Sequence, residues 1–220
     1  MINPLIRRSV LAGALIAMGC LFSMAAAPYG PVVQGLCFSV GLFGVLTCNA
    51  RLFTGGILST MDLWGHRIGF GAMCKTWTTT WAGNLAGALC VALMASQTGV
   101  DATGIAAAKA ATPWHELLIR AGLCNVMVCM AVHVYHETWR SGWERNRSSS
   151  LVLDALASCV LPVACFVACG FEHSVADMLH MPLGVMQGAV DVWQCVYVIG
   201  LATVGNVMGG VVFAALVWEG

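Results

Sequence analysis

The most evident lack in this 220-residue sequence is charge. Only 9% of the residues are Asp, Glu, Lys or Arg, whereas a typical soluble domain carries about 25%. Hydrophobic residues make up 59% of the chain, and the mean hydropathy is +0.83. This number of charges is too small to cover a water-facing surface. The composition therefore predicts an integral membrane protein of the all-α class that is surrounded by lipid.

An excess of either charge is also lacking, because ten basic residues balance ten acidic ones. We therefore expect no nucleic-acid partner. Eleven cysteines are present, but no Cys-x-x-Cys pair occurs, and most of them are scattered through apolar runs. Cys165 and Cys169 lie four residues apart without a third ligand at a suitable spacing. We interpret the cysteines as packing residues and expect neither a metal nor a cofactor.

Long hydrophobic runs are abundant, and six of them approach the roughly 20 residues that a membrane-crossing helix needs. They cover residues 5–27, 32–48, 70–95, 117–139, 151–183 and 192–218. Residues 49–56 ("NARLFTGG") interrupt the second run before a short continuation over 58–64, and residues 170–174 interrupt the fifth. Breaks of this kind persist in a membrane only where protein or a cavity satisfies the freed backbone groups. We therefore predict one transmembrane channel domain over residues 1–220.

The two halves of the chain resemble each other. "TWAGNLAG" (80–87) and "TVGNVMGG" (203–210) share a glycine-asparagine core at Asn84 and Asn206, and "LFTG" (52–55) corresponds to "FEHS" (171–174). Three helices in each copy is an odd number, so the second copy is inserted upside down. The pattern predicts inverted repeats of 3+3 helices, at about 5–95 and 117–218, with a binding site near the bilayer midplane.

Basic residues predict the orientation. With both termini in the cytoplasm, the outer side receives only Lys109 and Arg120. The inner side receives Arg7, Arg8, Arg67, Lys75, Arg140, Arg145 and Arg147. This distribution follows the positive-inside rule.

Glu172, His173 and Asp177 cluster at the second break, where an ionisable residue costs about 2.5–3.5 kcal/mol on insertion scales. Histidine exchanges protons near neutral pH, so His173 is the candidate proton-exchanging group, with the Thr54 hydroxyl opposite to orient it. The alternative is a buried histidine bonded to a neighbouring helix. Glu172 is expected to accept backbone N–H groups freed at the break, and Asn84 and Asn206 to hold the two breaks in shape.

Several motifs together resemble the formate/nitrite transporter family, in order along nearly the whole chain. They are "NARLFTGG", "WAGNLAGALC", "GLCNVMVCMAV", "LPVACFVACGFEHSVADM", "MPLG" and "TVGNVMGGVVFAALVW". The resemblance implies an aquaporin-like protomer in a homopentamer of the bacterial inner membrane. Each protomer would carry its own pore for formate, nitrite or hydrosulfide, together with protons.

The resemblance also implies roles for individual residues. The central pore histidine corresponds to His173 and its facing threonine to Thr54. Apolar narrow points correspond to Phe38, Leu42 and Phe166 on the cytoplasmic side, with Leu52 and Phe53 near the other side. Such apolar walls exclude hydrated ions and favour a species that can become neutral, so a weak-acid anion plus a proton is the expected cargo.

Three positions depart from the family pattern. Arg51 stands at an acidic position, Ala155 replaces the lysine that usually follows the aspartate of the fifth helix, and Asp177 replaces an asparagine. We expect Arg51 to supply the positive field of the missing lysine, with Asp177 as its counter-ion. The alternative is that Arg51 extends to the membrane interface.

The sequence thus predicts a channel or proton-coupled transporter for small anions, not an enzyme, and the short link between His173 and Asn206 slightly favours nitrite over formate. One alternative keeps the fold but conducts hydrosulfide or a small neutral solute. A distant alternative is an intramembrane enzyme using His173 and Ser174. Adjacent residues cannot readily form a nucleophile–base pair oriented by a third group, which argues against this reading.

Overall fold

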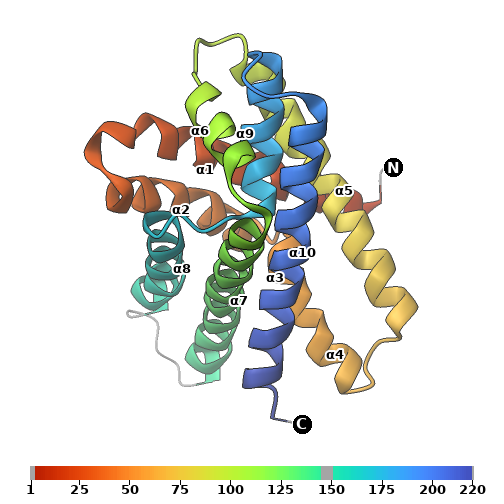
Figure 1. Cartoon of the computed structure of the whole chain (residues 1–220). Coiled ribbons are helices and arrows are strands. Elements are labelled where there is room, and N and C mark those ends of the chain that lie inside the picture. Colours follow the sequence, from red (N-terminus) through yellow and green to blue (C-terminus); the bar gives the residue numbers. More distant parts are fainter. Residues whose placement is uncertain (1–2, 145–150, 220) are drawn as a thin grey trace.

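The structure, a computed structural model, describes residues 3–144 and 151–219, and every regular element in that part of the chain is a helix (Figure 1). The all-α prediction is therefore confirmed. Arg145, Arg147 and the side chain of Ala155 lie outside the described part. The long helices are α1 (Pro4–Ala25), α2 (Pro31–Thr47), α5 (Phe70–Ala95), α7 (Trp114–Glu144), α8 (Leu151–Ala168), α9 (Ser174–Met186) and α10 (Val192–Val217). The short elements are η1 (Ala27–Tyr29), α3 (Phe53–Gly56), η2 (Ile57–Ser59), α4 (Thr60–Trp64) and α6 (Thr103–Ala111).

Four helices in the described ranges are long and apolar enough to cross a membrane. They are Pro4–Ala25, Phe70–Ala95, Trp114–Arg140 and Val192–Val217. Two shorter apolar helices, Pro31–Thr47 and Leu156–Ala168, lie directly before the two interruptions that the sequence predicts. The protein is therefore multi-pass, with full-length helices beside helices that end inside the predicted runs.

The first interruption is shorter than expected. Helix α2 ends at Thr47, Asn49 adopts a left-handed φ of 50°, and the chain is extended at Leu52. Helix α3 then begins at Phe53 and continues through η2 and α4 to Trp64. The continuation was predicted only from residue 58, because the glycines of "FTGG" read as part of the break.

The second interruption lies between Ala168 and Ser174. Gly170 adopts a φ of 67°, a left-handed conformation that favours glycine, and α9 starts at Ser174. Helix α9 ends at Met186, beyond the predicted residue 183, and continues past the internal Pro182. Residues from Ser174 to Gly184 are all buried, so this short helix lies inside the protein.

Helix α6 was missed by the sequence analysis, which treated residues 103–111 as part of an outer connection. Asp101 stabilises its start, because its carboxylate accepts hydrogen bonds from the Thr103 backbone N–H at 2.8 Å and hydroxyl at 2.7 Å. These bonds lower the pKa of Asp101. Helix α6 packs on α9, where a Cβ on Gly184 would lie 2.3 Å from the Ala106 side chain.

A buried asparagine of α5 fastens the first interruption to two other segments. The Asn84 side-chain amide donates to the backbone oxygens of Ser9 at 2.8 Å and Arg51 at 2.9 Å. Its oxygen accepts the Phe53 N–H at 2.8 Å. Asn84 therefore bonds backbone groups on both sides of Leu52. Leu52, the N-cap residue of α3, has no side-chain acceptor, so Asn84 caps the N-terminus of this helix instead.

Asn206 of α10 makes the matching set of bonds at the second interruption. Its amide donates to the backbone oxygens of Ala121 at 2.7 Å and Glu172 at 2.9 Å, and its oxygen accepts the Ser174 N–H at 2.9 Å. The expectation that the Glu172 carboxylate accepts the N–H freed at this break is therefore wrong for Ser174, and the Glu172 carboxylate bonds Lys109 instead. An amide accepts this N–H, because it can donate and accept at the same break.

Glycines bring the helices that carry these asparagines close to their partners. In Figure 1, α7 and α10 run alongside one another, and a Cβ on Gly209 of α10 would lie 1.9 Å from the backbone oxygen of Gly122 in α7. Helix α1 approaches α5 similarly, since a Cβ on Gly13 would lie 1.9 Å from the Asn84 backbone oxygen. Small residues allow such close contact between helices in a membrane.

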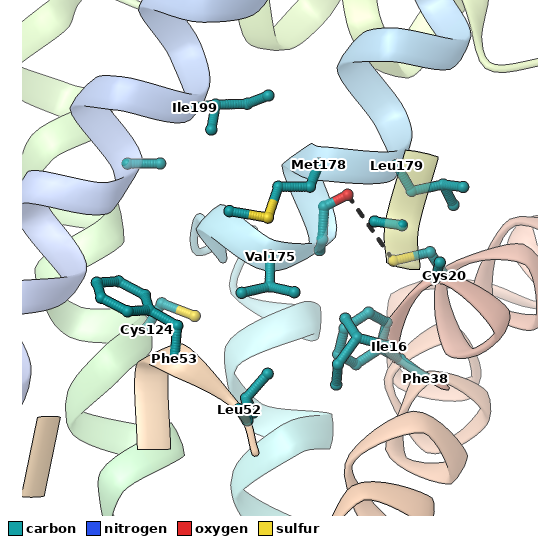
Figure 2. Close-up of a cluster of buried hydrophobic side chains, with 14 of the residues drawn as sticks. Ile16, Cys20, Phe38, Leu52, Phe53, Cys124, Val175, Met178, Leu179 and Ile199 are labelled. Carbon is teal, nitrogen blue, oxygen red and sulfur yellow. Dashed lines mark hydrogen bonds between the residues drawn. The ribbon is translucent and has the colours of Figure 1, made fainter. Parts of the chain in front are cut away.

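Apolar side chains from several elements surround the start of α9. Figure 2 shows Val175 and Met178 of α9 among residues of other helices, with Ile16 and Phe38 on one side and Ile199 on another. The Cys20 thiol of α1 contacts the Ala176 backbone oxygen at 4.0 Å. This packing holds the second break at a defined place in the protein.

We predict that Gly209→Ala destabilises the protein, because its methyl group would overlap Gly122. Overpacking of this kind costs about 1–3 kcal/mol, which corresponds to a melting temperature lowered by roughly 2–12 °C. Gly200→Ala is the matched control in α10, since a Cβ there meets nothing within 4 Å. Thermal unfolding in detergent checks this, and equal melting temperatures for both variants would contradict it.

We also predict that Asn206→Asp destabilises the second break. The substitution keeps the shape but replaces a donor to the Ala121 and Glu172 carbonyls with an acceptor. Unsatisfied buried groups cost about 1–3 kcal/mol each. Asn49→Asp serves as the control, because Asn49 is exposed and Asp tolerates its left-handed φ. Thermal unfolding of the two variants measures the difference, and an unchanged Asn206→Asp protein would refute the assigned role.

Candidate functional site

His173 lies immediately before α9 and is 3% exposed. Its Nδ1 accepts the Ala176 backbone N–H at 3.2 Å, and its Nε2 lies 2.9 Å from the Thr54 hydroxyl oxygen. Because a backbone N–H always donates, Nδ1 carries no proton in the neutral ring. The proton of the neutral ring is therefore on Nε2, which donates to Thr54.

Thr54 belongs to α3 and is fully buried. The contact between Thr54 and His173 joins the two interruptions, as the sequence analysis expected from their positions in the two halves. Asn125 of α7, which the sequence analysis did not single out, donates to the backbone oxygens of Thr54 at 3.3 Å and Asn206 at 2.6 Å. The available signal was a lone asparagine within an apolar span, which usually has a bonding role.

A first cavity of about 320 Å³ reaches His173. Phe166 stacks on the imidazole with ring centroids 5.9 Å apart, and Phe38 approaches the imidazole edge-on at 6.3 Å. Phe38 and Phe166 also contact each other at 5.6 Å. Two aromatic rings thus border the histidine on the side of this cavity, whose polar lining includes Lys109, Arg120, Glu172 and His180.

A second cavity of about 350 Å³ reaches Leu52 and Phe53. Its polar and charged lining includes Arg51, Asp62, Arg67, His133 and His136. Leu52 and Phe53 are 6% and 4% exposed, and Phe53 directly precedes Thr54. His173 and Thr54 therefore stand between the two cavities, with apolar side chains on each side.

The placement of the apolar narrow points differs from the expectation. Phe38 and Phe166 line the same cavity as Lys109 and Arg120, which the charge distribution assigns to the outer side. Leu52 and Phe53 share the other cavity with Arg67, which that distribution assigns to the inner side. The cytoplasmic assignment of Phe38 and Phe166 thus contradicts the charge-based orientation. Leu42, grouped with them, is 2% exposed in the core and lines neither cavity.

The expected ion pair between Arg51 and Asp177 is wrong. Asp177 is fully buried and pairs with Lys109, whose Nζ lies 2.9 Å from Asp177 Oδ1. Lys109 also pairs with Glu172. Arg51 is exposed at the second cavity, whereas Lys109 and Glu172 line the first. The basic groups that share the first cavity with His173 are therefore Lys109 of α6 and Arg120 of α7, and not Arg51.

A metal centre has no support in the described part of the chain, where no group of three or more His, Cys, Asp or Glu side chains is arranged to hold an ion.

Comparison with known proteins identifies relatives over nearly the whole chain. A family model described as "Formate/nitrite transporter" matches residues 2–219. The formate channel FocA of Escherichia coli K12 is 33% identical over 196 residues, covering 81% of this chain but only 65% of FocA. A probable formate transporter of Methanothermobacter thermautotrophicus is 31% identical over 96% of this chain and 85% of that protein. The nitrite transporter NirC of Salmonella typhimurium is 30% identical over 94% of this chain and 79% of its own length.

Solved structures agree with these relatives. An FNT family ion channel superposes with a TM-score of 0.84 at 27% identity, covering 97% of this chain and 89% of that one. A structure described as a pentameric formate channel with formate bound has a TM-score of 0.75 at 25% identity, covering 96% and 94%. These proteins are channels and transporters, not enzymes. The chain belongs to the formate/nitrite transporter family.

Proposed function

We propose that the chain conducts small monovalent weak-acid anions, formate or nitrite, across a membrane, with proton exchange at His173. The observation that carries this proposal is the buried 2.9 Å contact between His173 Nε2 and the Thr54 hydroxyl. His173 lines the first cavity, and Thr54 directly follows Phe53, which lines the second. A donor at that position can bond an anion that arrives from either cavity.

The assembly that fits this proposal is a homopentamer of six-span protomers with an inverted 3+3 repeat in a bacterial inner membrane. One solved relative is described as pentameric. The matched bonds of Asn84 and Asn206 support the repeat. Cytoplasmic termini fit this proposal, because Lys109 lies in a buried ion cluster and leaves Arg120 as the outer basic residue.

The geometry supports a specific order of events at His173. The Nε2–H bond to Thr54 is exchanged for a bond to the anion, while Phe38 and Phe166 on one side and Leu52 and Phe53 on the other exclude its hydration water. An anion is costly in these apolar walls, so the protonated acid crosses them more easily. Proton exchange by the ring requires Nδ1 to release the Ala176 N–H when it takes up a proton.

A second candidate cargo is hydrosulfide, crossing as hydrogen sulfide, or another small neutral solute. The observation that favours it is the pairing of Lys109 with both Glu172 and Asp177, which leaves this ion cluster without excess positive charge. Less attraction for anions on the His173 side makes a neutral species a relatively better passenger.

Arg51 provides a positive charge at the other cavity. It lines that cavity together with His133 and His136, and it forms no ion pair with any residue in the described ranges. Arg67 lines the same cavity, but its Nε lies 2.8 Å from Asp62 Oδ1. We therefore assign the attraction of anions into this cavity to Arg51 rather than Arg67.

We predict that His173→Asn lowers anion uptake and weakens its pH dependence. An asparagine side chain can still cap α9, as His173 Nδ1 does. It is too short to replace the bond between His173 Nε2 and the Thr54 hydroxyl. A hydrogen bond to a charged group contributes about 1.5–3 kcal/mol, so uptake of the anion should fall roughly ten- to hundredfold. The measurement is formate, nitrite and hydrosulfide uptake into proteoliposomes over a pH series.

His66→Asn is the control for that experiment, because His66 is exposed with a φ of 55° that asparagine tolerates. The wild-type protein and the control should take up more anion as the external pH falls. An uptake and a pH dependence in His173→Asn equal to those of the wild-type protein would refute proton exchange at the histidine. Uptake of hydrosulfide without formate or nitrite would favour the second candidate.

We predict that Arg51→Ala reduces anion uptake severalfold at low ionic strength, with a smaller effect at high salt, because screening weakens the attraction. Arg51→Lys should retain most of the uptake. Arg67→Ala is the matched control, since its charge is already paired with Asp62. Initial uptake rates at two salt concentrations test this prediction, and equal rates for Arg51→Ala and Arg67→Ala would contradict it.

A further inference from the structure

The strongest unassigned feature is a buried cluster of two carboxyl groups and one amine. Lys109 from α6 contacts Glu172 from the second break and Asp177 from α9. The side chains of Lys109, Glu172 and Asp177 are 12%, 5% and 0% exposed. Fully ionised, the cluster would hold two negative charges and one positive charge in a nearly dry site.

The surroundings of the cluster do not balance the second negative charge. The neighbouring titratable groups are His173, His180, Cys20, Cys124, Cys195 and Arg120. Arg120 is paired with Glu116, and Nδ1 of His173 is occupied by the Ala176 N–H. A thiol carries no positive charge in any protonation state. His180 forms no ion pair with Glu172 or Asp177, so no described neighbour other than Lys109 pairs with these carboxyl groups as a cation.

The contacts of Asp177 also indicate that its negative charge is not fully balanced. Apart from the Lys109 amine, no donor in the described part of the chain hydrogen-bonds to either carboxylate oxygen of Asp177. The Glu172 and Asp177 carboxyl groups both contact the same Lys109 amine, which holds them close together. Two ionised carboxylates are both acceptors and repel each other, but one proton allows a hydrogen bond between them.

We propose that Glu172 and Asp177 share one proton beside Lys109, so that the cluster is a buried proton-binding site distinct from His173. The proton makes the cluster neutral, with one ammonium, one carboxylate and one carboxylic acid. Loss of the proton leaves a net negative charge next to a cavity that also reaches His173. That charge repels an incoming anion, so the occupancy of this site controls anion entry from the Lys109 side.

The inference deepens the proposed function, because it places a second proton beside the anion pathway. The proton site also depends on a position at which this chain departs from the family pattern, where Asp177 replaces an asparagine. Asparagine at position 177 would leave Lys109 and Glu172 as a balanced pair that needs no proton. Asp177 thus makes the neutral state of the cluster dependent on proton binding.

Infrared spectroscopy of the full-length protein in lipid tests the site directly. A protonated carboxyl group absorbs at a higher frequency than a carboxylate, and the band shifts in deuterated water. The wild-type protein should show one such band at neutral pH. Asp177→Asn and Glu172→Gln should each remove it, because either change leaves one carboxylate balanced by Lys109. Asp191→Asn is the control, since Asp191 is exposed and asparagine also caps a helix.

Lys109→Met provides the opposite test. Without the amine, both carboxyl groups should hold a proton, and the band should grow about twofold relative to wild type because two acids replace one. Absence of the band in the wild-type protein would overturn the proposal. So would its persistence in either Asp177→Asn or Glu172→Gln, because the proton would then belong to one carboxyl group alone.

Uptake measurements separate this inference from the proposed function. If the cluster controls entry, Asp177→Asn should take up more anion than the wild-type protein at alkaline pH, while the two proteins converge at acidic pH. Equal uptake across the whole range would overturn the control of entry. A wild-type protein that carries no anion at any pH would refute the proposed function, while the infrared result would still decide whether the proton is shared.

Discussion

The structure depends on how two interruptions of the backbone are satisfied away from water. Lipid cannot bond the N–H and C=O groups that are freed where α2 and α8 end, so protein groups must do so. Asn84 and Asn206 meet this requirement, each by donating twice and accepting once. The positions of Thr54 and His173 follow from these bonds. Thr54 lies in the first turn of α3, which restarts beside Asn84, and His173 directly precedes α9, which restarts beside Asn206.

Electrostatics differ between the two cavities that approach this centre. Lys109 at one cavity is paired with two carboxyl groups, whereas Arg51 at the other forms no ion pair with a described residue. The first arrangement responds to proton binding, and the second provides a positive charge that responds mainly to salt. Together they make the two entrances to His173 chemically unequal, although the asparagine bonds at the two breaks are closely matched.

Particular elements show where sequence reasoning reached its limit. The end of the first break was placed too late, because glycines in "FTGG" suggested a loop while the Asn84 cap allows α3 to start at Phe53. Helix α6 was missed because nine residues are too few for a membrane span, and its packing against α9 is a long-range contact. Phe38 and Phe166 were expected on the opposite side of the membrane from Lys109, but the three residues line the same cavity. Long-range packing decides which residues share a cavity, and the sequence motifs do not show it.

The sequence by itself determined the membrane environment, the family, the two interruptions and the prominence of His173 and Thr54. These properties are encoded locally, in hydropathy and in short motifs that each lie within one segment. Only the tertiary structure decided that Lys109 rather than Arg51 pairs with Asp177, and which nitrogen of His173 carries the proton. Both depend on which groups from distant segments meet in a buried site, since low polarity there makes each pairing energetically decisive.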